Sequence, residues 1–213
     1  MVFTCNQRHD GRGTFWKDLM TYAREARDDG HILRPVVAPR PIGVMLGLNG
    51  SQNPFSGTPT YRSIEHLPLD QRVKTMSQPD IRAKILSEDP VKQSTFPLIH
   101  RILFTQMFRL GSPANYTPSP EESISAMAQN LGVTPQEMAY DILLENQGRE
   151  FIYAPLVNYA NYTMDACAEM LDDPYSIMGL GDGGAHVGVI LDAGYPTWLI
   201  SYWTVSYTHL TLP

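Results

Sequence analysis

Hydrophobic and polar positions in the first forty residues follow a strand, a helix and a second strand. Residues 2–5 form a β-branched and aromatic run that is typical of a strand. Residues 15–28 then place apolar side chains at helical spacing, and Gly30 ends that pattern; the spaced positions are Leu19, Tyr22, Ala23 and Ala26. Residues 32–38 form a short apolar run. This order predicts a βαβ unit, and therefore two parallel strands.

The alternation stops between Gly43 and about Pro118. Gly, Pro, Asn and Ser interrupt residues 48–60, and helices are predicted over residues 68–76 and 79–87. Residues 96–108 are rich in apolar side chains. A long excursion of this kind between two α/β elements is typical of a lid or a binding insertion.

Helix signals return in the last third of the chain. Ser119 is followed by a proline and two glutamates, a pattern that favours a helix start. Thr134 and Glu137 form a predicted capping box that opens a helix to about Glu145.

The remaining elements are shorter. Residues 151–156 are predicted as a strand or an extended connection, 164–171 as a helix, 175–180 as the last strand and 197–204 as an amphipathic helix. The fold class predicted from the whole pattern is α/β with an insertion.

Composition narrows the functional classes. The chain of 213 residues carries a net charge of −6, and the clustered Lys and Arg that bind phosphates are missing, so a nucleic-acid partner is not expected. No apolar run approaches the roughly 18 residues of a membrane span. We expect a small-molecule substrate as the partner and favour a cytoplasmic location, and the sequence leaves the oligomeric state open.

The two cysteines, Cys5 and Cys167, are far apart and predict no disulfide framework. We expect both thiols to be reduced and buried in the core. The sequence contains no H-x-H, H-E-x-x-H or C-x-x-C motif, so it includes no complete metal motif of its own.

Residues 176–188, S-I-M-G-L-G-D-G-G-A-H-V-G, carry the strongest chemical signal. A short apolar run ends in Asp182, two glycines follow, and His186 lies four residues further on. Glycines let a backbone turn sharply and let a ligand approach closely. The residues alone leave two interpretations open: Asp182 is an active-site carboxylate, or it caps a local N–H in a tight turn.

Two segments together resemble a known family. Residues 177–186 are similar to the last-strand motif of the N-acyl-D-amino-acid deacylase (D-aminoacylase) group of the amidohydrolase superfamily, and Leu191–Ala193, Pro196–Thr197 and Tyr202–Thr204 resemble the segment that follows it. Residues 34–43, R-P-V-V-A-P-R-P-I-G, with Asn53–Phe55 after them, resemble an earlier strand and the start of that family's insertion.

The resemblance implies a partial (β/α)₈ TIM-type barrel, and a full barrel needs eight strands and about 250 residues. This chain would supply about the last three strands, with a long helical insertion between the penultimate and last strands. The predicted division is a strand–helix–strand unit at residues 1–42, a lid-like insertion at 43–118, and helices with the last barrel strand at 119–204. Residues 205–213 resemble translated sequencing-adapter read-through, and we expect them to be a non-native tail.

The resemblance also implies zinc-assisted hydrolysis of C–N (amide) bonds, in N-acyl-(D-)amino acids or related amides. Asp182 matches the family's last-strand aspartate, which serves as general base and in some relatives also touches the metal. The other metal ligands would lie upstream of Met1, so the isolated chain is expected to be inactive while the intact parent is an enzyme.

Three further residues are candidate substrate contacts. His186 could contact the substrate or steady the loop of Asp182, or it could be satisfied locally at a helix start. Arg40 could bind a substrate carboxylate with two hydrogen bonds, or form an ion pair at the surface or with the lid. His9 follows the first strand and could face the substrate, or lie in a solvated loop.

Two other functions compete with this one. A partial barrel leaves sheet edges and apolar helix faces uncovered, which would make the chain catalytically inactive and prone to association. A phosphate or nucleotide binder would use residues 179–188 as its cradle, but their spacing fits neither G-x-G-x-x-G nor G-x-x-x-x-G-K-[ST].

Overall fold

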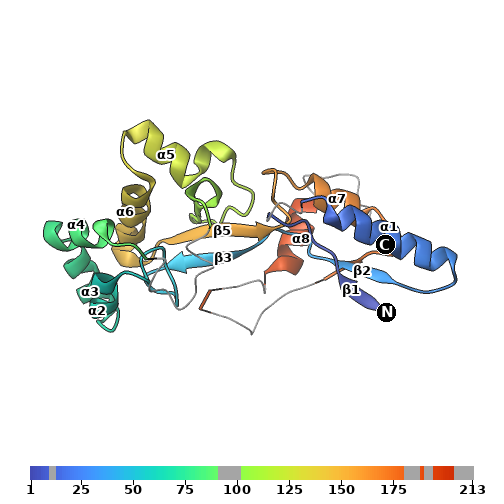
Figure 1. Cartoon of the computed structure of the whole chain (residues 1–213), viewed down its shortest axis with the longest axis horizontal. Coiled ribbons are helices and arrows are strands. Elements are labelled where there is room, and N and C mark those ends of the chain that lie inside the picture. The colour runs from blue at the N-terminus through green and yellow to red at the C-terminus, as the bar shows by residue number, and fades with distance from the viewer. Residues whose placement is uncertain (10–12, 91–101, 180–187, 190–193, 204–213) are drawn as a thin grey trace. The chain divides into compact units, whose positions relative to one another are not determined.

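The computed structural model describes residues 1–9, 13–90, 102–179, 188–189 and 194–203 (Figure 1). It has the mixed α/β architecture that the sequence predicts. The chain divides into two compact units, one formed by Met1–Gly43 with Pro155–Pro213 and the other by Val44–Ala154. Among the described residues, every helix is too short or too polar to span a membrane.

A small parallel sheet forms the centre of the first unit. It contains β1 (Val2–Thr4), β2 (Arg34–Val37) and β6 (Ile177–Met178), in the spatial order β1-β2-β6. Phe3 lies opposite Pro35, and Val36 lies opposite Ile177, with both strand pairs parallel. Helix α1 (Phe15–Asp28) connects β1 to β2, so the predicted strand–helix–strand unit is confirmed.

Pro35 sits inside the central strand of this sheet. Arg34 donates its backbone N–H to the carbonyl of Met1, so alternate N–H groups of β2 face β1. The nitrogen of Pro35 therefore faces the β6 side, where the described pairing begins only at Val36 and Ile177. The missing N–H thus falls just outside the ladder, which explains why a proline is tolerated here.

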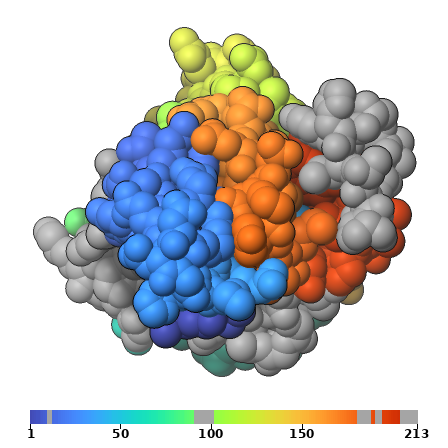
Figure 2. Space-filling view, turned by 90° about the vertical axis from the view of Figure 1, so that its right-hand side faces the viewer, coloured from blue at the N-terminus to red at the C-terminus, as the bar shows by residue number. Residues whose placement is uncertain are grey.

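Two helices cover the sheet of the first unit. Helix α1 buries Trp16, Met20 and Ala23, and both α1 and α7 (Asp165–Leu171) pack on β2. Figure 2 shows the blue residues of α1 beside the orange residues that include α7. The core between these elements contains both cysteines, which are fully buried and free, as the sequence predicts. Besides Trp16 and Met20, its other buried members are Val37, Tyr159, Met164, Ala166, Met170 and Trp203.

The last described helix, α8 (Tyr195–Trp203), is fixed to the sheet through its final residue. The indole Nε1–H of Trp203 donates to the carbonyl oxygen of Pro39 at 2.6 Å, and Trp203 is 1% exposed. Trp198 stacks on Tyr202 with ring centroids 4.2 Å apart. The bond to Pro39 ties α8 to the chain that leaves the carboxyl end of β2.

A second sheet contains β3 (Ile42–Gly47), β5 (Phe151–Val157) and β4 (Phe108–Arg109), in the order β3-β5-β4, and most of its residues belong to the second unit. Strand β5 confirms the strand interpretation of residues 151–156. Strand β3 was not predicted, because the sequence pattern placed these residues at the start of the insertion. Its residues from Gly43 to Gly47 are all buried, so the alternation that marks a half-exposed strand is missing.

Five α-helices of the second unit are described: α2 (Pro59–Ile64), α3 (Leu69–Met76), α4 (Pro79–Ser87), α5 (Ile124–Leu131) and α6 (Pro135–Gly148). Residues 68–76 and 79–87 are therefore helical as predicted. The helix signal at Ser119 produces only the 3₁₀ turn η3 (Pro120–Glu122), and a second 3₁₀ turn is η2 (Phe104–Gln106). Tyr140 of α6 donates its hydroxyl hydrogen to the Met76 carbonyl at 2.9 Å, which links α6 to α3.

The capping box predicted at the start of α6 is confirmed. Glu137 Oε2 accepts hydrogen bonds from both the backbone N–H and the hydroxyl of Thr134, each at 2.8 Å. The hydroxyl oxygen of Thr134 accepts the N–H of Glu137 at 3.2 Å. Regular helical backbone ends near Glu145, as expected, because Asn146 and Gln147 have φ values of 48° and 56°.

Replacing Thr134 by alanine should lower the free energy of unfolding by about 1 kcal/mol, because the N-terminal N–H groups of α6 lose their cap. Urea unfolding of the full chain measures this change. Thr75→Ala is the matched control, since Thr75 only bonds the Gln71 carbonyl within α3. Equal losses in the two variants would show that the cap contributes nothing specific.

Candidate functional site

The residues that follow the parallel strands of the first unit form the candidate site. Parallel strands end at the same edge of a sheet, so the segments after β1 and β2 meet there. His9 is the fifth residue after β1, and Arg40 is the third residue after β2. Asp182 and His186, the two candidates of the glycine-rich motif, lie outside the described residues; Asp182 is four positions beyond the end of β6.

Asn158 organises this edge and was missed by the sequence analysis. Its side-chain oxygen accepts the backbone N–H of Gln7 at 2.8 Å, and its amide nitrogen donates to the carbonyl of Ala38 at 3.0 Å. The same nitrogen lies 3.3 Å from Oδ1 of Asn6, and its backbone N–H donates to the Gln7 carbonyl at 2.8 Å. One buried side chain thus joins the segments after β1 and β2 to the end of β5.

The backbone of Asn158 is held in an uncommon conformation. Its φ is +62°, in the left-handed region where Asn is tolerated better than most residues, and its side chain is 0% exposed. Gln7, 5% exposed, extends the network by accepting the N–H of Ala160 at 3.0 Å. These buried hydrogen bonds hold the segments that follow β1 and β2 in a fixed arrangement. The available signal was a polar residue two positions after the predicted strand at 151–156.

His9 is half-buried, and burial lowers its pKa below the ordinary histidine value. The neighbouring residue Arg8 forms a β-bridge with Val157, which holds this segment against the chain that leads to Asn158. A neutral imidazole can donate from one ring nitrogen and accept at the other. His9 is therefore suited to a neutral hydrogen-bonding role near pH 7.

Arg40 is 2% exposed, so its side chain is buried rather than at the protein surface. It follows Pro39, whose carbonyl is bound by Trp203. A buried guanidinium presents up to five N–H donors in a fixed plane and stays positively charged. Its position beside the Asn158 network places a cation at the same edge as His9.

The described residues do not by themselves contain a candidate zinc site. No group of three His, Cys, Asp or Glu side chains within the described part of the chain could hold a metal ion. Burial raises the pKa of the Cys5 thiol to about 11 and raises the pKa of Cys167 as well. Both thiols are therefore protonated at neutral pH, and Cys167 donates its hydrogen to the Ala38 carbonyl.

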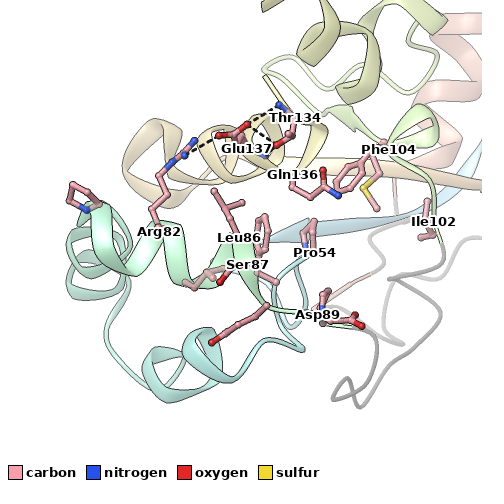
Figure 3. A pocket seen from close by; sticks show the side chains of 17 residues that line it. Pro54, Arg82, Leu86, Ser87, Asp89, Ile102, Phe104, Thr134, Gln136 and Glu137 are labelled. Carbon is pink, nitrogen blue, oxygen red and sulfur yellow. Dashed lines mark hydrogen bonds and ion pairs between the residues drawn. The ribbon is translucent and has the colours of Figure 1, made fainter. Parts of the chain in front are cut away.

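A pocket of about 930 Å³ lies in the second unit, between α4, the start of α6 and the segment around η2 (Figure 3). Its apolar lining includes Phe55, Leu86 and Phe104. Its charged groups already have partners within the protein: Arg82 pairs with Asp141 at 3.0 Å and Glu137 at 3.7 Å. Glu88 accepts the N–H and hydroxyl of Thr60. The pocket is thus mainly apolar, and its charged side chains Arg82, Glu137 and Glu88 bond to other groups of the protein.

No family model matches the chain, and neither does any curated protein or solved structure.

Asn158→Ala should lower the free energy of unfolding by about 3 kcal/mol, because buried partners lose their hydrogen bonds and alanine is strained at positive φ. Asn158→Gly should cost about 1 kcal/mol less, since glycine adopts this φ without strain. Urea unfolding of both variants separates the two contributions. Equal destabilisation by alanine and glycine would contradict a left-handed backbone conformation at residue 158.

The pH dependence of stability should report the environment of His9. Because its native pKa is lowered, the stability associated with neutral His9 is present above pH 6.5 and is lost as the pH falls through the native pKa. We expect the urea midpoint of the wild type to fall with acidification in this window, and that of His9→Gln to fall less. Parallel curves for the two proteins would contradict burial of His9.

Proposed function

We propose that this chain is part of a metal-dependent hydrolase that cleaves C–N bonds, with N-acyl-amino acids or related amides as the substrate class. Its part in that enzyme is to bind the substrate and to supply the carboxylate Asp182. The proposal rests on the resemblance of residues 177–186 to the D-aminoacylase group.

One structural observation supports the proposal above the others. The three strands β1, β2 and β6 are parallel and neighbour each other in chain order, without a reversal. Neighbouring strands in a (β/α)₈ barrel have this order, whereas a doubly wound sheet reverses its order at the ligand crevice. Helix α1 connects the first two strands, and α7 precedes the third. The arrangement is the one that a wall of three consecutive barrel strands would have.

We assign a role to each candidate residue that follows one of the three parallel strands. Asp182 acts as general base and His186 as a substrate contact, both on the segment after β6. Arg40 binds a substrate carboxylate, and neutral His9 donates or accepts one hydrogen bond. Asn158 positions the segments that carry Arg40 and His9, through its bonds to Ala38 and Gln7.

Zinc would supply an activated water in the intact enzyme. Its ligand set lies outside the described residues, so the metal remains an implication of the resemblance. In this proposal Arg40, His9 and His186 bind and orient the substrate, and each can be tested without assuming where the metal lies.

The test is hydrolysis of N-acyl-D-amino acids and their L-isomers by the longest protein that contains this chain, assayed with added zinc and with chelator. Asp182→Asn should lower kcat by about a hundredfold or more, because the general base is lost. Asp172→Asn, which changes an exposed aspartate at the end of α7, should leave kcat unchanged.

Arg40→Lys should raise KM more than it lowers kcat, because lysine keeps the charge but loses the planar donor pair. Thermal unfolding of each variant separates a folding defect from a binding defect. Full activity of Asp182→Asn, or no zinc-dependent hydrolysis of any amide tested, would refute the proposal.

A further inference from the structure

A small polar pocket lies in the second unit. It has a volume of about 280 Å³ and is formed by the turn after β3 together with α2 and α3. Its polar lining includes Asn49, Ser51, Ser56, Tyr61, Glu65 and Arg72. This volume is just below the usual range for ligand sites, which suits a ligand of only a few heavy atoms.

Arg72 is fixed in place but its charge is not neutralised. Its guanidinium donates to the carbonyls of Leu48 at 2.8 Å and Leu67 at 3.0 Å, and to the Tyr61 hydroxyl at 3.2 Å. All three acceptors are neutral, and no carboxylate among the described residues pairs with Arg72. Its Nε is buried without a hydrogen-bond partner. A rigid, partly desolvated cation of this kind favours a bound anionic group.

Two hydroxyl groups can add to this anion site. Tyr61, 3% exposed, accepts hydrogen bonds from the side chains of Arg72 and Asn53, and Ser56 accepts one from the backbone N–H of Asn53 at 2.8 Å. Each therefore retains its own O–H hydrogen, for which the described residues show no acceptor. Burial raises the pKa of Tyr61, so its hydroxyl keeps its proton at neutral pH. Both hydroxyls are donors available to a ligand oxygen.

Glu65 gives the same pocket a negative charge. It is exposed at the end of α2, and among the described residues it has no ion-pair partner. Arg72 and Glu65 thus line one small pocket as an unpaired cation and an unpaired anion. A simple anion would be repelled by Glu65, whereas a ligand with both charges would satisfy both groups.

We propose that this pocket binds a small zwitterion with the chemistry of a free α-amino acid. The ligand carboxylate lies against Arg72, Tyr61 and Ser56, and the ligand ammonium lies against Glu65. The pocket volume of about 280 Å³ selects a ligand with a small side chain. The lining of this pocket includes none of the residues proposed for catalysis, so Asp182→Asn should leave its affinity unchanged.

The experiment follows ¹H–¹⁵N correlation spectra of the full chain during titration with alanine, acetate, methylammonium and inorganic phosphate. We expect alanine to cause saturable shifts at the amides of Gly50 and Ser51 and at the Nε–H of Arg72. Acetate should bind more weakly, and methylammonium should cause no saturable shift. Absence of saturation at millimolar alanine, or acetate or phosphate binding at least as tightly as alanine, would overturn the proposal.

Charge variants test the zwitterion directly. Glu65→Gln should weaken alanine binding by about threefold, as expected for an exposed charge, and should leave acetate binding equal or tighter. Glu121→Gln, an exposed glutamate outside the pocket, should change neither. Arg72→Lys should weaken alanine and acetate alike by about tenfold. If Arg72→Lys fails to fold, Glu65→Gln decides alone, and equal affinity of Glu65→Gln and wild type for alanine refutes the proposal.

Discussion

Parallel pairing of β1, β2 and β6 is the constraint on which the first unit depends. Parallel neighbours cannot be joined by a tight turn, so the chain must leave the sheet and return by way of long connections. The helix α1 makes the first return, and the whole second unit lies in the sequence between β2 and β6. Because the strands point the same way, the residues that follow each of them gather at one edge.

Hydrogen bonding at that edge gives the strand ends a fixed geometry. Asn158 joins Gln7 and Ala38, while Trp203 holds the carbonyl of Pro39. Buried polar groups are costly unless they are paired, so each of these bonds constrains the segment that carries it. His9 and Arg40 follow directly on segments constrained in this way. The same edge is the place where a hydrolase of the proposed class would require preorganised contacts.

The second unit shows how charge can serve either structure or recognition. Around the larger pocket, Arg82 pairs with Asp141 and Glu137, so those charges hold α4 to α6. In the smaller pocket, Arg72 is bonded only to neutral oxygens and Glu65 has no described partner. A charge that is paired within the protein is less available to bind an opposite charge on a ligand. This difference assigns a binding role to the smaller pocket.

Sequence alone determined the elements whose signals are local: the helix at residues 15–28, the capping box of Thr134, and the parallel strands on either side of α1. These follow from spacing and from the hydrogen bonds of adjacent residues. The tertiary structure decided β3, whose burial on both faces removes alternation, and the network of Asn158, whose partners are 120 and 151 positions away. It also decided that Arg72 and Glu65 share a pocket, because burial and pairing depend on which distant segments pack together.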